Sequence, residues 1–184
     1  MYGKKVRDIM RPITECAVVF ENATLADAMI ALDEAQELLP PGRQRHRAVL
    51  VQDDKGRIVG KLGYLGFLKA LEPKYSSIGD VERLSRAGVG GDLMNVIMDS
   101  YRFWQDDLDG VRQRAHHIRV KEVMVPVEEG IDVNSSVTEA MHHLIMKQSL
   151  SVVVRMKGVA VGMLRLSDLF DEVAAFIKST RNDE

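Results

Sequence analysis

Val120-Lys-Glu-Val-Met-Val-Pro126 decides the fold, because the chain contains nearly the same stretch once before, as Val6-Arg-Asp-Ile-Met-Arg-Pro12. A second pair of blocks follows in the same order, where Ser136-Val-Thr-Glu-Ala-Met141 repeats Thr24-Leu-Ala-Asp-Ala-Met29. Internal repeats define the structural unit of a chain and are sought before any other feature.

A third pair of blocks completes the repeat. Gly158-Val-Ala-Val-Gly-Met-Leu164 matches Gly56-Arg-Ile-Val-Gly-Lys-Leu62, and the three blocks keep their order in both halves. The spacing between blocks changes only where loops can absorb a difference in length. The protein is therefore predicted to be a tandem of one unit.

Composition narrows the class of protein. The 184 residues include 25 basic and 27 acidic side chains, and the net charge of -2 argues against binding of nucleic acid or an anionic membrane through bulk charge. The chain has no apolar run of 18 residues and starts without the apolar stretch of a signal sequence. Because the single Cys16 cannot form an intramolecular disulfide, we expect a cytoplasmic location.

Each repeat is predicted to run strand, helix, strand, strand, helix. In the first repeat we expect strands at 16–20, 47–51 and 57–62, a helix beginning at Thr24 and a helix at 65–71. Thr24 and Asp27 can each accept a hydrogen bond from the other's amide, which is a capping box. The apolar stripe of this helix consists of Leu25, Ala28, Met29, Leu32 and Ala35.

The second repeat follows the same order. Its expected strands are 131–133, 150–155 and 159–164, and its helices begin at Ser136, capped through Glu139, and at Ser167. The unbroken apolar run at 152–154 predicts a strand that is covered on both faces. The expected fold class is α/β (α+β), with two repeats packed about a pseudo-twofold axis.

The ordered motifs resemble the cystathionine beta-synthase (CBS) domain, whose tandem pairs are called Bateman modules. The resemblance rests on Met-x-Pro, a capped helix, two strands joined at a glycine, and the stretch from Gly162 to Asp168. It covers residues 5–72 and 119–178, about two thirds of the chain, and leaves 73–118 as a helical insert. It implies a non-catalytic regulatory module that binds AMP, ADP, ATP or S-adenosylmethionine between its repeats and forms homodimers.

The resemblance also implies a ligand site in the second repeat. Nucleotide-binding members of the family carry Gly-x-x-Ser/Thr-x-x-Asp, in which the Asp accepts from both ribose hydroxyls and the Ser or Thr binds phosphate. Here Gly162 and Asp168 are kept, but Arg165 stands at the Ser/Thr position. Arginine can bind phosphate as a two-pronged donor, or its bulk can fill the cleft. Asp168 also stands where an acidic residue caps a helix.

The first repeat departs further from the family pattern. Its matching positions are Gly63 and Gly66, so we expect this cleft to have lost nucleotide binding. By the same resemblance, the adenine of a ligand in the second repeat would contact Gly130 and Ile131. Gly130 would permit close approach of a flat ring, and it equally suits a turn before a strand.

Two other clusters contain residue types that bind phosphate or metal ions. Arg43, Arg45 and Arg47 alternate before a strand, where they would either hold a phosphate tail or form a solvated basic loop. The pairs at 116–117 and 142–143 are adjacent histidines, which point about 100° apart on a helix and lack further ligand spacing, so we expect no metal site.

The insert is predicted to contain one long amphipathic helix. Its apolar positions recur at steps of three and four residues, as Leu93, Ile97, Tyr101, Trp104, Leu108 and Val111. The stripe would pack on its own module, on a second subunit or on a partner.

Two functional classes follow. The first is a stand-alone sensor of an adenosine-containing ligand, which Asp168 favours; the second is a structural or partner-binding pair with no working nucleotide site, which Gly63, Gly66 and Arg165 favour. No nucleophile with a base, carboxylate pair or phosphate loop can be assembled, so we do not expect an enzyme. The regulated protein cannot be named from the sequence.

Overall fold

A computed structural model describes residues 3–42, 44–72, 74–77, 96, 108–127 and 129–179. Its elements are, in chain order, η1 (Val6–Asp8), β1 (Arg11–Pro12), η2 (Ile13–Glu15), β2 (Val18–Phe20), α1 (Leu25–Glu37), β3 (Ala48–Gln52), β4 (Ile58–Gly63), α2 (Tyr64–Leu71), α3 (Lys74–Ser77), α6 (Leu108–His117), α7 (Val120–Val123), β5 (Val125–Pro126), β6 (Ile131–Asp132), α8 (Val137–Met146), β7 (Ser151–Met156), β8 (Val159–Arg165) and α9 (Leu166–Ser179).

Both predicted capping boxes are present. Thr24 accepts from the amide of Asp27 at 3.1 Å, and Asp27 accepts from the amide of Thr24 at 2.9 Å. Ser136 and Glu139 exchange the same two bonds, at 3.1 and 2.7 Å, at the start of α8. Because each box satisfies two amides that the helix leaves unpaired, it fixes the residue at which the helix begins.

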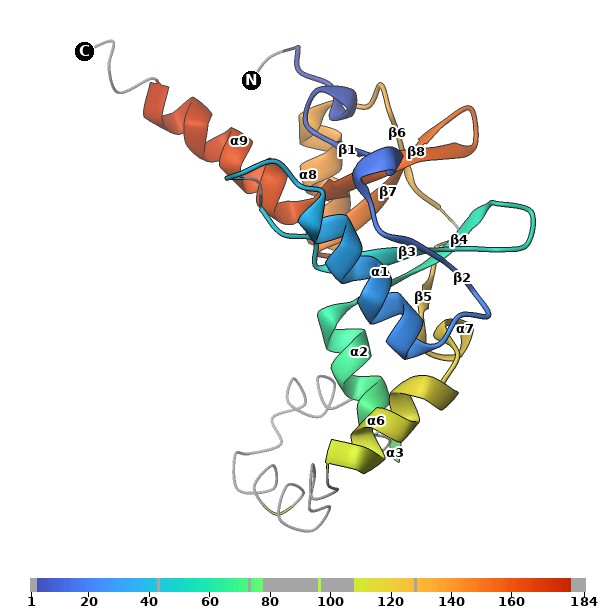
Figure 1. Cartoon of the computed structure of the whole chain (residues 1–184). Helices are drawn as coiled ribbons and strands as arrows, with labels where there is room; N and C mark the ends of the chain where they lie inside the picture. Colours follow the sequence, from blue (N-terminus) through green and yellow to red (C-terminus); the bar gives the residue numbers. More distant parts are fainter. Residues whose placement is uncertain are drawn as a thin grey trace.

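The strands form two four-stranded sheets, in the orders β2-β3-β4-β5 and β1-β8-β7-β6. β2 runs parallel to β3 in the first sheet, and β6 runs parallel to β7 in the second. The remaining pairs are antiparallel. Figure 1 shows α1 and α2 with the first sheet and α8 and α9 with the second. The predicted fold class and the order of elements are confirmed.

The two repeats exchange their Met-x-Pro segments. In the first sheet β5 of the second repeat pairs with β4, so that Gly60 lies opposite Pro126; in the second sheet β1 pairs with β8, so that Gly162 lies opposite Pro12. Val6 is buried in the core of the second repeat, and the matching Val120 in the core of the first. This reciprocal exchange relates the halves by a pseudo-twofold axis, and the spatial units therefore differ from the sequence repeats.

The apolar core has three parts. One lies under each sheet against its helices, and a third joins the sheets through Leu50, Ile58, Val153 and Met163. The run at 152–154 is buried throughout, with Val152 and Val154 toward the helices and Val153 toward the other sheet. This confirms the strand predicted to be covered on both faces. Met29 was predicted to lie on the buried stripe of α1, but it is 45% exposed because the core contacts pass through Leu25, Ala28 and Leu32.

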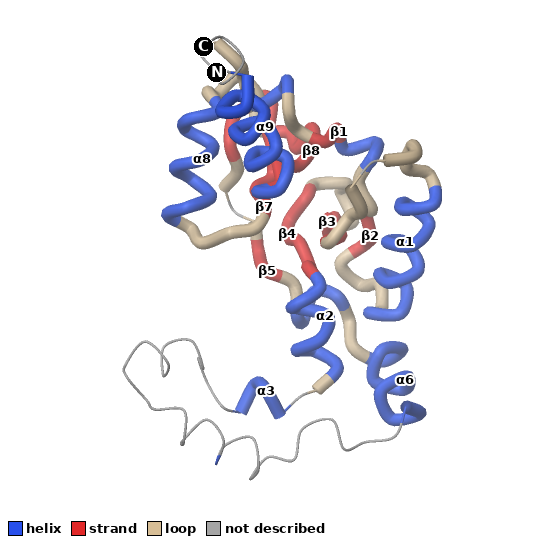
Figure 2. The backbone as a smooth tube through the Cα atoms, turned by 90° about the vertical axis from the view of Figure 1, so that its left-hand side faces the viewer, coloured by secondary structure: helices blue, strands red, loops and turns tan. Residues whose placement is uncertain are grey.

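The insert is described in part. Leu93, Ile97, Tyr101 and Trp104 of the predicted amphipathic helix lie outside the described residues. The described helix α6 packs against α1 and α2 (Figure 2), with Val111 against the first core and Leu108 exposed. In the part of the chain that the structure describes, no helix combines the length and apolar character needed to cross a membrane.

Candidate functional site

The predicted site residues Arg165 and Asp168 lie where β8 ends and α9 begins, facing β1 and the segment 44–46 of the first repeat. We call this region the repeat 2 cleft. Arg165 donates two hydrogen bonds to the carboxylate of Asp168, from Nε to Oδ2 at 2.6 Å and from Nη2 to Oδ1 at 2.5 Å. Arg11 of the exchanged strand adds a third, 3.2 Å from Nη2 to Oδ1. The exposed fractions of the three side chains are only 6 to 10%.

These contacts control the charge of the carboxylate. Burial by itself would raise the pKa of Asp168, but hydrogen bonds from Arg165 and Arg11 and their positive charges outweigh it and hold the pKa below its usual value. Asp168 is therefore ionised at neutral pH. The carboxylate of Asp168 already accepts three hydrogen bonds from Arg165 and Arg11. It can accept from two further hydroxyl groups only if at least one of these guanidinium groups moves away.

Arg165 also crosses to the first repeat. Its Nη1 donates to the carbonyl oxygens of Gln44 at 3.3 Å and Arg45 at 3.0 Å. All three nitrogens of this guanidinium are therefore engaged by Asp168 or by the first repeat. One guanidinium thus links the last strand of the second repeat to the segment before β3 of the first.

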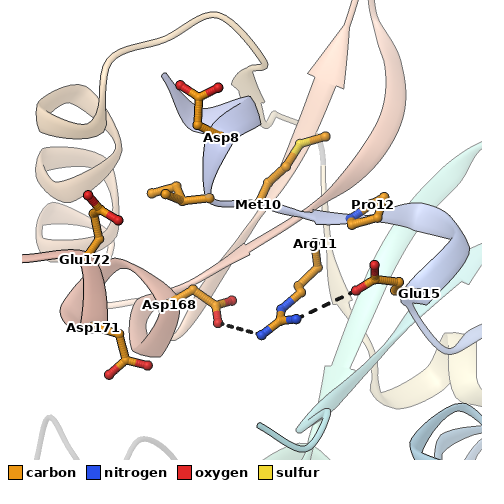
Figure 3. A pocket seen from close by; sticks show the side chains of 9 residues that line it. Asp8, Met10, Arg11, Pro12, Glu15, Asp168, Asp171 and Glu172 are labelled. Carbon is orange, nitrogen blue, oxygen red and sulfur yellow. Dashed lines mark hydrogen bonds and ion pairs between the residues drawn. The ribbon is translucent and has the colours of Figure 1, made fainter. Parts of the chain in front are cut away.

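A cavity of about 390 Å³ lies beside Asp168 (Figure 3). Its lining is Asp8, Ile9, Met10, Arg11, Pro12, Glu15, Asp168, Asp171 and Glu172. The cavity is therefore bounded on one side by the exchanged segment and on the other by the first two turns of α9. Five of the nine lining residues carry carboxylates and one carries a guanidinium.

Several buried polar atoms beside the cleft lack hydrogen-bond partners among the described residues. They are Nη1 of Arg11, Oε2 of Glu15 and both ring nitrogens of His46. The Arg11 and Glu15 atoms lie 3.7 Å apart, as the dashed line in Figure 3 marks, which is longer than a hydrogen bond. Buried polar groups are almost always paired with protein, water or ligand, so the Arg11 and Glu15 atoms, whose residues line the cavity, are candidates to bind a polar ligand.

His46 and Cys16 were not predicted as site residues. His46 is 1% exposed, and its burial, with the positive charges of Arg165 and Arg11, lowers its pKa. Burial raises the pKa of the Cys16 thiol to about 11. The one available signal was the alternation at 45–47, which places Arg45 and Arg47 outward and His46 inward, as the exposure of the three residues shows.

The remaining predicted site residues are not gathered at Asp168. Gly162 lies under β1, and a Cβ atom there would overlap the carbonyl oxygen of Arg11, so this glycine serves close strand packing. Gly130 and Ile131 lie by β6, at the sheet edge opposite β1, with β7 and β8 between. Arg43 lies outside the described residues, and Arg45 and Arg47 are exposed.

Solved structures of CBS-domain proteins share this architecture. A CBS domain of a membrane protein from Sphaerobacter thermophilus matches with a TM-score of 0.60 and 20% identity, over 91% of this chain and 86% of its own. The CBS-pair protein CBSX2 from Arabidopsis thaliana matches with a TM-score of 0.60 and 15% identity, over 96% and 98%. CBSX2 in complex with AMP matches with a TM-score of 0.61 and 16% identity, over 94% and 98%.

The CBS domain of a bacterial CNNM/CorC family Mg²⁺ transporter, in complex with ATP, also matches, with a TM-score of 0.56 and 16% identity over 93% of this chain and 87% of its own. No protein-family model and no curated protein matches the sequence. The chain therefore has the fold of tandem CBS pairs.

Proposed function

We propose that this tandem CBS fold is a regulatory module that binds one adenosine-containing ligand per chain in the repeat 2 cleft. The observation that carries the proposal is the cavity of about 390 Å³ beside an ionised Asp168, where Nη1 of Arg11 and Oε2 of Glu15 make, among the described residues, no hydrogen bond that a polar ligand would have to replace. The fold adds support, because proteins of this architecture have been crystallised with AMP and with ATP.

Ligand entry would require rearrangement of Arg165. The two ribose hydroxyls would take the Asp168 oxygens, and the released guanidinium would turn to a phosphate or carboxylate of the ligand. We place the base beside Met10 and Pro12, because these two residues line the cavity at Asp168 and Gly130 and Ile131 do not. Arg45 and Arg47 remain candidates for further phosphate contacts.

The cavity lining favours ligands with little negative charge. Its five carboxylates outnumber its one guanidinium and therefore repel polyphosphates, with solvent screening the charges of the exposed Asp8 and Asp171. We therefore expect AMP or S-adenosylmethionine to bind more tightly than ATP in the absence of a divalent cation.

We propose no catalytic activity for the cleft. Ion pairs join Arg11 to Glu15 and both Arg11 and Arg165 to Asp168. The thiol of Cys16, with a pKa of about 11, is a poor nucleophile at neutral pH. Ligand binding would change the contacts that Arg165 makes between the repeats, and a regulated protein would respond to this change. We place the module in the cytoplasm, since Cys16 is free.

A second candidate is a partner-binding pair with a closed cleft. It is favoured by the bidentate Arg165 contact, which occupies both oxygens of Asp168. In this case the ion pair is a permanent internal link between the repeats.

Calorimetry with AMP, ADP, ATP and S-adenosylmethionine separates the two candidates. Asp168→Asn keeps the shape of the side chain and removes its charge, so affinity should fall about ten- to a hundredfold. Asp54→Asn is the matched control, because it removes the same charge in an exposed turn away from the cavity. Failure of all four ligands to bind would favour the closed module, and unchanged affinity in Asp168→Asn would place the site elsewhere.

A further inference from the structure

Lys61 occupies a position that the fold otherwise uses for core packing. It follows Gly60 on β4 and pairs with Leu50, as Met163 follows Gly162 on β8 and pairs with Val153. Met163 is 1% exposed and belongs to the core between the sheets. A lysine therefore stands in the first repeat where the second repeat has a buried apolar side chain, and packing does not require its charge.

The ammonium group of Lys61 reaches across to the second repeat. It donates to Oγ of Ser149 at 2.9 Å, to Oγ of Ser151 at 3.2 Å and to the carbonyl oxygen of Ser151. It makes no ion pair with a carboxylate in the described part of the chain. Burial lowers the pKa of Lys61, as expected for a half-buried cation without a counter-ion.

The serine hydroxyls add donor capacity at the same place. Ser151 is 9% exposed and accepts from Lys61, and the described residues offer no acceptor for its own hydroxyl hydrogen. Ser149 donates to the carbonyl oxygen of Ser151 at 2.7 Å and can turn toward another acceptor. One cation and two hydroxyls thus converge without an acidic side chain.

The first repeat lacks the two side chains that pair in the second repeat. Gly63 and Gly66 stand at the positions that carry Arg165 and Asp168 in the second repeat. A Cβ atom at Gly63 would meet nothing nearer than the Arg47 carbonyl oxygen at 3.6 Å, an ordinary contact. Neither backbone conformation nor close packing therefore requires glycine at position 63, and the first repeat has no counterpart of the Arg165–Asp168 ion pair.

We propose that Lys61, Ser149 and Ser151 form an anion site in the first repeat that takes a phosphate group. A tetrahedral oxyanion accepts from an ammonium and two hydroxyls together and supplies the missing counter-charge. The site contains no carboxylate to accept ribose hydroxyls, so it recognises phosphate and not adenosine. Inorganic phosphate and the phosphate of a nucleotide share this chemistry. The proposal is independent of Asp168 and of the repeat 2 cleft.

Isothermal calorimetry with inorganic phosphate at constant ionic strength tests the proposal. Wild type should bind, and Lys61→Met, which restores the residue type of the matching position, should bind about ten- to a hundredfold more weakly. Ser149→Ala and Ser151→Ala should each weaken binding severalfold, and they keep the proposal testable if Lys61→Met fails to fold. The exposed Lys69→Met is the control.

Asp168→Asn separates this site from the proposed nucleotide cleft, since it should leave phosphate binding unchanged. AMP binding that survives in Asp168→Asn and disappears in Lys61→Met would identify nucleotide phosphate as the source; adenosine should not bind this site. The proposal is overturned if wild type shows no phosphate binding, or if Lys61→Met binds phosphate as tightly as wild type.

Discussion

Arg165 holds both oxygens of Asp168, the residue three positions later, through parallel hydrogen bonds of 2.6 and 2.5 Å. Arg165 is the last residue of β8 and Asp168 lies in the first turn of α9, so the contact spans the junction between strand and helix. The same arginine reaches the carbonyl oxygens of the first repeat, so the carboxylate, the guanidinium and the two repeats are mechanically connected. A ligand that takes the carboxylate must break this connection.

Replacing Arg165 by alanine should change affinity for adenosine and AMP in opposite directions. Adenosine should bind more tightly because the carboxylate of Asp168 no longer accepts two hydrogen bonds from Arg165. AMP loses a charge-assisted contact to phosphate, so the ratio of AMP affinity to adenosine affinity should fall about tenfold. Calorimetry with both ligands measures the ratio. Arg57→Ala, in a remote turn, is the control, and an unchanged ratio would remove Arg165 from phosphate recognition.

Gly162 and Gly63 should respond differently to a side chain. A Cβ atom at Gly162 would overlap the carbonyl oxygen of Arg11 and lie 3.2 Å from Cα of Pro12, so Gly162→Ala must displace β1. We expect a loss of about 1–3 kcal/mol in the free energy of unfolding. Gly63→Ser has room and supplies a helix N-cap, so urea unfolding should show no loss. Equal stability of both variants would contradict the close packing of β1.

His46 should make the protein less stable as the pH falls. Its pKa is lowered in the folded state by burial and by Arg165 and Arg11, although Glu15 and Asp168 act in the opposite direction. The unfolded chain therefore binds the proton first, and stability present above pH 6.5 is lost as the pH decreases below it. Asp168, whose folded pKa is also lowered, loses its contribution only below pH 3.8.

The test compares unfolding free energies between pH 7.5 and pH 5. His46→Leu should flatten the decline, whereas the exposed His142→Leu should retain it. A decline of unchanged slope in His46→Leu would assign the pH dependence to other groups.

Cys16 should resist alkylation in the folded protein. With a pKa of about 11, roughly one thiol in a thousand is ionised at pH 8, and only the thiolate reacts. The thiol also donates to the carbonyl oxygen of Pro12 at 3.4 Å. Mass spectrometry after iodoacetamide treatment should show slow modification that becomes fast in urea. Rapid modification of the folded chain would show that the thiol is less buried.

The local elements could be predicted because their signals lie within a few residues. Thr24 with Asp27 and Ser136 with Glu139 mark helix starts by a contact three residues long. The run at 152–154 marks a strand whose neighbours on both sides are apolar. Repetition of the blocks then implied the tandem fold.

The exchange of β1 and β5 could not be predicted, because each strand has two residues and no period can be recognised in so short a stretch. The role of Lys61 could not be predicted for a related reason. Its significance depends on Ser149 and Ser151, about 90 positions away, and on comparison with Met163. Contact of Gly130 with a ligand stays a prediction of the resemblance, and the exchange of β1 places Met10 and Pro12 at the cavity beside Asp168.

The last prediction is a twofold homodimer, which we propose from two matched apolar positions. Leu68 on α2 and Phe170 on α9 occupy equivalent places in the two repeats, and they are 54% and 69% exposed. A twofold interface uses the same patch on both chains, so side chains already related by an internal pseudo-twofold axis suit it.

Sedimentation at low micromolar concentration should show a dimer. Phe170→Glu should weaken it about thirtyfold or more, as expected for loss of a large apolar anchor, and Val159→Glu, in the exposed β7–β8 hairpin, should not. A monomer in wild type, or a dimer unaffected by Phe170→Glu, would show that these residues do not form the interface.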